Sequence, residues 1–249
     1  MSVLTMRSWL CVLLAGVLLR PAVTCAAEHV DVALVMVSDV SRSIDDAEFK
    51  LEKDGYVAAF TSPEVIHAIQ AGPIGAIGVA YVEFAGAGEV RTVLGWRVIR
   101  DTASAHAFAA ALAAQPRSFW GRTAISSGID LAMQMLAKSG LAPTRRVIDV
   151  CGDGTNNAGR EITGARDDAL KAGITINGLA IVNEHPVSWI FAHVQPPGGL
   201  PNYYRHNVTG GPGSFVLEVH DFHTFAEAMR RKLITEIAAH TPQRYAAWP

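Results

Sequence analysis

Oxygen-bearing side chains follow an apolar run near the start of the chain. The run covers residues 30–37, and Asp39, Ser41 and Ser43 come after it at alternate positions. One carboxylate and two hydroxyls at this spacing can converge on one point, and hard cations such as Mg2+ prefer oxygen ligands. Asp and Ser also cap helices, which is the purely structural interpretation of the same residues. The segment therefore predicts either a cation site or a helix cap.

The elements around this segment favour a ligand site. Residues 30–37 are rich in valine and too few to cross a membrane, which is typical of a strand buried on both faces of a parallel sheet. Asp45, with Glu48 three residues later, has the pattern of a capping box that begins a helix. Open α/β sheets bind ligands where strands end and helices begin.

The rest of the chain alternates between strand and helix patterns. Further strands are expected at residues 76–84, 90–94, 146–151, 175–182 and 214–219, and helices at 45–62, 101–114, 126–140, 166–172 and 221–237. Only residues 85–89 separate the second strand from the third, and so short a link permits a hairpin but no parallel crossover. The order predicts an α/β fold with a doubly wound, mostly parallel six-stranded sheet, one antiparallel edge strand and helices on both faces. Residues 183–213, rich in proline, glycine and aromatic residues, are expected to hold short helices at 187–194 and 202–206.

The N-terminus has the layout of a secretory signal peptide. Arg7 precedes an apolar stretch at residues 9–19, which Pro21 and small residues follow. This stretch is too short to span a bilayer. We expect a signal peptide at 1–27, one domain at 28–240 and a tail at 241–249, in a secreted or periplasmic protein without a transmembrane segment. A lipid anchor at Cys25 is disfavoured, because Thr24 is bulkier than the small residue expected before an acylated cysteine.

Charge and cysteine content narrow the classes of partner and reaction. The chain has 21 Lys+Arg against 23 Asp+Glu, a formal net charge of −2, and no basic cluster that would follow a phosphate backbone. Nucleic acid is therefore not expected as a partner. Cleavage of the leader removes two of the 3 cysteines. Cys151, in an expected buried strand, is then predicted to be an inert packing residue.

Two later segments also place oxygen ligands near expected strand ends: GRTAI at residues 121–125 and GDGTNN at residues 152–157. D-x-S-x-S, a distant Thr and a distant Asp, in this order, resemble the metal-ion-dependent adhesion site of von Willebrand factor A-type domains. The resemblance covers about residues 30–239. More narrowly, DVSRSID, RRVIDVCGDGTNN, INGLAI and GGPGSFV resemble a bacterial family of secreted, uncharacterised von Willebrand A-like proteins. The resemblance implies a metal site at Asp39, Ser41, Ser43, Thr123 and Asp153.

The resemblance implies different roles for these ligands. Ser41 and Ser43 would contact the metal directly, the two aspartates directly or through water, and Thr123 in the ligand-bound form. Two carboxylates offset the charge of Mg2+, or of Mn2+ or Ca2+, whereas hydroxyls donate little, so the cation stays electrophilic with an open position. A carboxylate from a protein partner can fill that position. The predicted function is a secreted, metal-dependent protein-binding module, and not an enzyme.

Two other functions stay open. GDGTNN superficially resembles the metal loop of haloacid-dehalogenase-type phosphatases, which would make the protein a Mg2+-dependent phosphohydrolase. That chemistry needs an acid/base aspartate two residues after the nucleophile, and Ser41 stands there. The third possibility is a structural domain with a vestigial metal site.

Residues near the expected site have two interpretations each. Arg42 either recruits an anionic partner over the metal or lies on the surface. Asn156 and Asn157 either orient their loop by hydrogen bonds or serve ordinary turn chemistry, which is favoured.

Residues nearer the C-terminus are equally ambiguous. His220 and His223 have a spacing that could hold a metal, but surface positions beside a helix cap are favoured. Tyr203, Tyr204 and Trp189 form either a binding surface or packing beneath a long loop.

Overall fold

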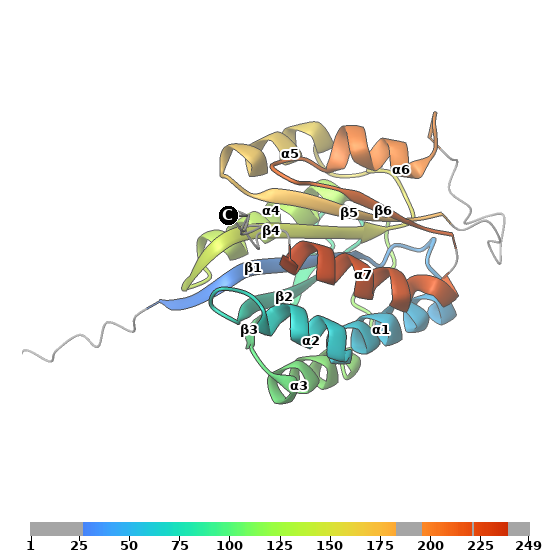
Figure 1. The fold of residues 1–249 in the computed structure, drawn as a ribbon. Helices are drawn as coiled ribbons and strands as arrows, with labels where there is room; N and C mark the ends of the chain where they lie inside the picture. The colour runs from blue at the N-terminus through green and yellow to red at the C-terminus, as the bar shows by residue number, and fades with distance from the viewer. Residues whose placement is uncertain (1–26, 183–195, 221, 239–249) are drawn as a thin grey trace, which may run out of the picture.

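The computed structural model describes residues 27–182, 196–220 and 222–238 and contains one six-stranded sheet. Its strands lie in the order β3-β2-β1-β4-β5-β6, and β3 is the single antiparallel strand, at one edge (Figure 1). The strands are β1 (Glu28–Asp39), β2 (Ile77–Phe84), β3 (Val90–Ile99), β4 (Leu141–Gly152), β5 (Thr175–Ile181) and β6 (Val216–Val219). This is the predicted doubly wound topology, with the strand order reversing beside β1.

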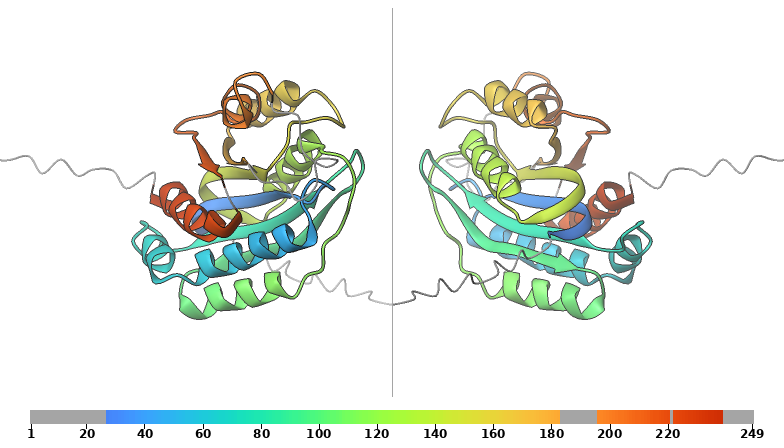
Figure 2. Two further views of the ribbon diagram at one scale, coloured as in Figure 1. Left: turned by 90° about the vertical axis from the view of Figure 1, so that its right-hand side faces the viewer. Right: turned by 90° about the vertical axis from the view of Figure 1, so that its left-hand side faces the viewer.

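Helices cover both faces of the sheet, as Figures 1 and 2 show. One face packs against α1 (Asp46–Thr61), α2 (Pro63–Gln70), α3 (Thr102–Ala113) and α7 (Phe225–Ala238). The other packs against α4 (Ile125–Ala137), α5 (Ile162–Lys171), α6 (Leu200–Tyr203) and a π-helical turn at Tyr204–Val208. A short 3-10 turn, Phe222–Thr224, precedes α7.

The central strand β1 explains why the sheet is buried on both faces. Alternate side chains of β1 enter opposite cores: Leu34 and Met36 pack beneath α1 and α7, whereas Val35 and Val37 pack beneath α4. β1 lies between β2 and β4 and is parallel to both. A strand with two apolar faces needs a helix layer on each side, which is the arrangement that its valine-rich sequence predicts.

Several boundaries differ from the sequence-based expectation. β3 is longer than expected, because exposed and half-buried residues alternate in its second half. β4 is also longer and begins at Leu141, because Pro143 and the polar residues 144–146 interrupt the apolar pattern ahead of its buried half. β6 is shorter, and the helix expected at 202–206 is divided between α6 and the π-helical turn. The expected helix at 187–194, the tail at 241–249 and all but the last residue of the expected signal peptide at 1–27 lie outside the described residues.

The helix α4 begins one residue earlier than predicted, at Ile125, and neither Ser126 nor Ser127 caps it. The residue in the N-cap position is Ala124, whose side chain makes no cap hydrogen bond. The side chain of Asn156 instead accepts a hydrogen bond from the Ser126 N–H at 3.0 Å. A side chain from a distant loop therefore accepts the hydrogen bond of a free N–H in the first turn of α4. For this reason the local sequence contains no capping residue at the start of the helix.

A buried ion cluster joins α7 to the sheet. Lys232, fully buried on α7, contacts Asp149 of β4 and lies 2.6 Å from Glu236 of the same helix. The amide of Asn177 donates to Glu236 at 2.9 Å. Burial raises the pKa of Asp149 and of Glu236, the latter to about 7, although the ammonium of Lys232 opposes both shifts. The cluster therefore holds two acids against a single cation.

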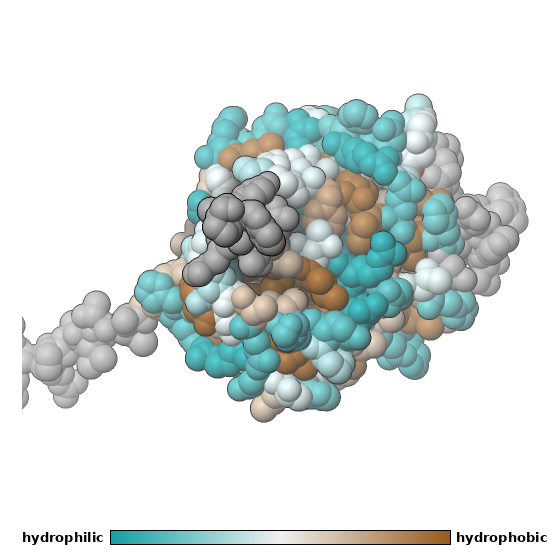
Figure 3. All heavy atoms as spheres, in the orientation of Figure 1, coloured by the Kyte–Doolittle hydropathy of each residue, from teal (hydrophilic) through white to brown (hydrophobic). Residues whose placement is uncertain are grey.

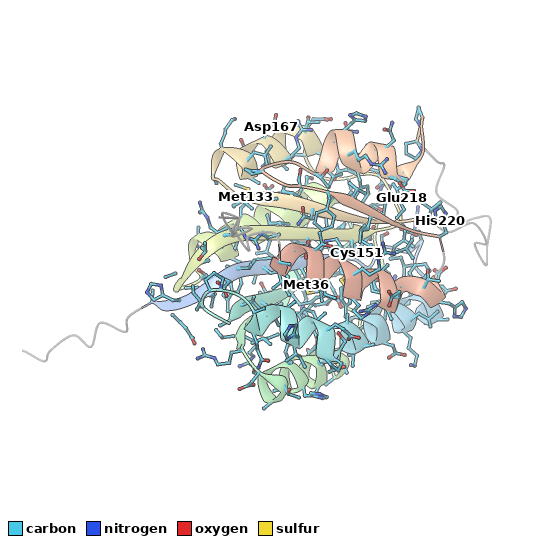
Figure 4. The ribbon with its side chains drawn as sticks, in the orientation of Figure 1. Met36, Met133, Cys151, Asp167, Glu218 and His220 are labelled. Atoms are coloured by element: carbon cyan, nitrogen blue, oxygen red, sulfur yellow. The ribbon has the colours of Figure 1, made fainter. Side chains whose placement is uncertain are left out.

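Cys151 lies in one of the two apolar cores that the sheet separates. Cys151 and Met36 belong to the cluster between the sheet and the α1, α7 layer (Figure 4), and burial raises the pKa of the Cys151 thiol. The prediction of a packing cysteine is confirmed. None of the described helices has the length and apolar character needed to cross a membrane. On the face drawn in Figure 3, hydrophobic and hydrophilic residues are intermixed.

Candidate metal centre

Two neighbouring parallel strands end together at the edge where the predicted ligands lie. β1 ends at Asp39 and β4 at Gly152, and Ser38 pairs with Cys151 in their common register. Asp39 and Asp153 therefore leave the sheet side by side, although 113 residues separate them in the sequence numbering. This edge beside the reversal of strand order is the usual ligand position of open α/β sheets.

The predicted ligands form one continuous hydrogen-bond network. Asp39 Oδ1 accepts from the Ser41 N–H at 2.7 Å, and Ser41 Oγ lies 3.1 Å from Ser43 Oγ. Ser43 Oγ donates to Asp153 Oδ1 at 2.9 Å, and Thr123 Oγ1 donates to Ser41 Oγ at 3.2 Å. Three separate loops thus bring two carboxylates and three hydroxyls together.

The composition of this network fits a hard divalent cation. All five side chains offer oxygen, which Mg2+, Mn2+ and Ca2+ prefer, and the two carboxylates match a charge of +2. Asp39, Ser41 and Thr123 are at most 1% exposed, Asp153 is 6% exposed, and Ser43 is partly exposed. Ser43 is therefore the candidate ligand most accessible to solvent.

Asparagine side chains position the Thr123 segment. Asn157 Oδ1 accepts from the Thr123 N–H at 3.0 Å, and the Asn157 N–H donates to the Thr123 carbonyl at 2.8 Å. Asn156 holds the first turn of α4 through Ser126, as described above. The favoured interpretation, ordinary turn chemistry, was therefore wrong: both amides fix the loop from Asp153 against the loop from Thr123.

Tyr204 is a neighbour of the site that sequence reasoning did not identify as such. A Cβ placed on Gly152 would lie 2.9 Å from Asp39 Cβ and 3.0 Å from the Tyr204 hydroxyl, so only glycine allows these groups to meet. Tyr204 is fully buried, and burial raises its pKa well above the usual value, with the charge of Asp39 adding to the effect. The phenol therefore stays neutral beside the two carboxylates.

The sequence alone also did not indicate that Arg117 contributes to the site. Its Nη2 donates to the carbonyls of Val40 at 2.8 Å and Ser41 at 2.7 Å, and its Nε donates to the Phe119 carbonyl at 3.0 Å. The guanidinium lies 3.7 Å from the centre of the Trp120 ring. One buried cation therefore ties the loop at 117–122 to the loop that carries the candidate ligands. No local motif identifies Arg117, because two of its three acceptors, the carbonyls of Val40 and Ser41, are distant in sequence.

A buried acid lies directly beneath the site. The Ser38 hydroxyl donates to Glu52 on α1, and burial raises the pKa of Glu52 to about 8, with further contributions from the charges of Asp39 and Glu83. Ser38 directly precedes Asp39 in β1, so the hydrogen-bond partner of Glu52 is the neighbour of a candidate ligand. A glutamate on an amphipathic helix would ordinarily be assigned to the solvent face, which is why its burial was not predicted.

The other candidates are resolved by burial. His220 and His223 are exposed, as favoured, and His220 Nε2 lies 3.9 Å from Glu218 Oε2 at the end of β6 (Figure 4). Within the described ranges, no group of three His, Cys, Asp or Glu residues could hold a metal. Tyr204 packs in the core, and the half-buried Tyr203 accepts from the Asn156 N–H at 3.2 Å through its hydroxyl, so the two tyrosines contribute to packing. Trp189 lies outside the described residues.

The fold is that of a von Willebrand factor A domain. Proximal thread matrix protein 1 from the mussel byssus superposes with a TM-score of 0.58 at 18% identity, over 85% of this chain and 47% of that one. The von Willebrand factor type A protein from Catenulispora acidiphila also gives 0.58, at 17% identity over 85% and 43%. BatB from Bacteroides thetaiotaomicron gives 0.52, at 20% identity over 84% and 99%. The chain thus spans less than half the length of the mussel and Catenulispora proteins.

Within this class, the chain belongs to the family of proteins of unknown function DUF1194, whose model matches residues 29–241. No curated protein shows significant similarity to it. One structure of the mussel protein is described as having a zinc-occupied MIDAS motif, that is, a metal-ion-dependent adhesion site. At this level of identity, the likeness establishes the fold, and the site must be argued from the residues of this chain.

Proposed function

We propose that the protein is a secreted or periplasmic protein-binding module that holds Mg2+ at Asp39, Ser41, Ser43, Thr123 and Asp153. The observation that carries the proposal is the network that joins these five side chains from three loops. The apolar leader at the N-terminus supports secretion. Residues of a signal peptide would be absent from the mature protein.

The residues of the chain divide the work of binding. The two aspartates supply the negative charge, and the hydroxyls of Ser41, Ser43 and Thr123 supply neutral oxygens. When bound, the cation supplies an electrophilic centre with room for one more oxygen ligand. Arg117 and Asn157 hold two of the loops in place before any partner arrives, which lowers the entropic cost of binding.

The partner we propose is a protein that presents an acidic side chain. The pair of site carboxylates only balances a divalent charge, so an additional carboxylate can bind without leaving a large net negative charge in the site. A site with four carboxylates would instead be saturated. Mg2+ is favoured over Ca2+, because Ca2+ usually binds more protein oxygens than these two carboxylates and three hydroxyls supply.

The residue chemistry does not favour the phosphohydrolase alternative. Two residues after Asp39, where such an enzyme needs an acid/base aspartate, the side chain is Ser41. A serine hydroxyl is a poor acid or base near neutral pH. Turnover of a generic phosphate ester by the pure protein, lost in Asp39→Asn, would reverse this preference.

Metal binding can be tested without knowing the partner. Thermal unfolding is followed in chelator and in excess Mg2+. If the Mg2+ concentration is a hundred times its Kd, binding stabilises the folded state by about 2.7 kcal/mol. Asp39→Asn retains an oxygen that can accept from the Ser41 N–H and removes only the charge. We expect the wild type to gain stability with Mg2+ and this variant to gain none.

The matched control is Asp167→Asn, on the solvent face of α5 and away from the site (Figure 4). It should respond to Mg2+ like the wild type. An equal rise in melting temperature in wild type and Asp39→Asn, or no rise in either, would refute the metal site. The absence of a rise in both proteins would favour the third possibility, a structural domain with a vestigial metal site.

A further inference from the structure

An aromatic residue with an unusual exposure stands beside the candidate metal centre. Trp120 is 56% exposed, and among the described residues only Ile74 is another exposed large hydrophobic side chain. Trp120 comes three residues before Thr123, in the loop that Arg117 ties to Val40 and Ser41. A partner that covers Trp120 removes apolar ring surface from water, which favours binding.

The Trp120 ring is held in place. The Arg117 guanidinium stacks on it at 3.7 Å, and three backbone carbonyls fix that guanidinium in turn. The Arg117 side chain is itself only 5% exposed. Because these contacts already restrict the Trp120 ring, less side-chain entropy is lost when a partner covers it. Fixed aromatic and arginine side chains are the residue types that dominate binding energy at protein interfaces.

Two arginines flank the same site. Arg42 lies between Ser41 and Ser43, and Arg122 directly precedes Thr123; both are exposed. The Arg42 N–H donates to the Gly121 carbonyl at 3.1 Å, which brings the two loops side by side. Across the part of the chain that the structure describes, neither guanidinium forms an ion pair or a side-chain hydrogen bond.

The acidic residues of these loops are already used within the chain. Asp45 caps α1 by accepting from the Glu48 N–H at 2.8 Å. Glu89 Oε2 accepts from the Gly86 N–H at 2.8 Å and lies against Gly121, where even a Cβ would collide with it. Asp46, whose side chain is 81% exposed, lies 3.7 Å from Arg117. Arg42 and Arg122 are exposed cations beside the candidate metal centre that make no ion pair within the described residues.

We propose that Arg42, Trp120 and Arg122, here called the rim, recognise the residues that flank the metal-binding carboxylate of the partner. The fitting partner is an acidic peptide segment with at least one further carboxylate and a neighbouring aromatic or apolar side chain. The further carboxylate pairs with a rim arginine, and the apolar side chain covers Trp120. This inference rests on the proposed function, because it adds specificity to the same site.

The test uses random peptides displayed on a surface and selected on the immobilised full chain in Mg2+. Enriched peptides should share two or more acidic residues and an aromatic or apolar residue. A synthetic peptide of the enriched sequence is then measured by calorimetry against Arg42→Ala, Arg122→Ala and Trp120→Ala. We expect each variant to bind it about tenfold or more weakly. The arginine variants should also show a smaller dependence of affinity on salt.

Arg97→Ala is the matched control, because Arg97 is an exposed arginine on the edge strand β3. It should bind the peptide like the wild type. The Mg2+-induced rise in melting temperature is recorded for every variant, and it separates loss of the rim from loss of the metal site. Trp120→Phe, which keeps an aromatic face, should recover part of the affinity lost in Trp120→Ala.

Two results would overturn the inference in different ways. Enriched peptides with a single acidic residue, or equal affinity for wild type and rim variants, would refute the rim while leaving the proposed function intact. No Mg2+-dependent enrichment, or equal enrichment on Asp39→Asn, would refute the proposed function and this inference with it.

Discussion

Glu52 provides a sharp test of the electrostatics beneath the candidate metal centre. Its carboxyl is 1% exposed, and its pKa rises from 4.5 to about 8 because burial disfavours the charged form. The charge of Asp39 adds to this shift, whereas the hydrogen bond from Ser38 opposes it. The change we consider is Glu52→Gln, which keeps the shape and an acceptor for the Ser38 hydroxyl but cannot ionise.

The sign of the pH effect follows from the direction of the shift. The folded protein holds the Glu52 proton up to about pH 8, whereas the unfolded chain releases it near pH 4.5. Between these values the folded state binds more protons, so the free energy of unfolding falls as pH rises. At 1.36 kcal/mol for each pKa unit, the full shift corresponds to about 5 kcal/mol. Above pH 8 the wild type should therefore be less stable than Glu52→Gln by up to this amount.

The assay is urea unfolding in chelator from about pH 5 to about pH 9, with the free energies of wild type and variant compared at each pH. The difference is expected to be small at the acidic end and to grow through neutrality. Comparison of the two proteins cancels the similar trend of Glu236, whose pKa is about 7. Glu161→Gln, at an exposed position before α5, should follow the wild type. Parallel curves for wild type and Glu52→Gln would refute the reasoning.

Three further substitutions test the packing around the sheet and the site. Lys232→Met removes the cation of the buried ion cluster and leaves two acids. We expect the free energy of unfolding, measured in urea, to fall by about 3–5 kcal/mol near pH 8, and by less at acidic pH, where the acids are protonated. An unchanged free energy of unfolding would contradict the role of the cluster. Gly128→Val places atoms 2.5 Å from Val37, so thermal unfolding should show a loss of about 1–3 kcal/mol. The control Gly95→Val, where a Cβ meets nothing within 4 Å, should not show this loss. Arg117→Met removes the bonds that hold the Ser41 loop, so the Mg2+-induced rise in melting temperature should shrink, and an unaltered rise would show that the loop needs no such support.

Local sequence patterns determined much of the fold. The valine-rich run of β1 predicts a strand buried on both faces, and both faces are buried. The Asp45 and Glu48 pair predicts a capping box, which the structure contains. The five-residue link at 85–89 predicts the antiparallel edge strand, and β3 is antiparallel to β2. Each of these features depends on residues close together in the chain, so periodicity and capping chemistry suffice to predict it.

The candidate site could be predicted only in part. The spacing of Asp39, Ser41 and Ser43 is visible in the sequence. The segments that carry Thr123 and Asp153 were noticed near expected strand ends, but only the resemblance assigned these two residues to the same site. Arg117 and the buried Glu52 were missed, and Tyr204 was named without its place beside Asp39. Their roles depend on backbone carbonyls, on a glycine gap and on burial between elements, none of which leaves a periodic signal.

The sequence by itself thus determined which segments become strands and helices, because each segment carries its own apolar period and end signals. Only the tertiary structure decided that Ser43 meets Asp153 across 110 residues and that Arg117 joins two loops beneath Trp120. The physical reason is that these contacts arise where parallel strands end at a common edge. Their geometry depends on the register and packing of the whole sheet, which no single segment specifies.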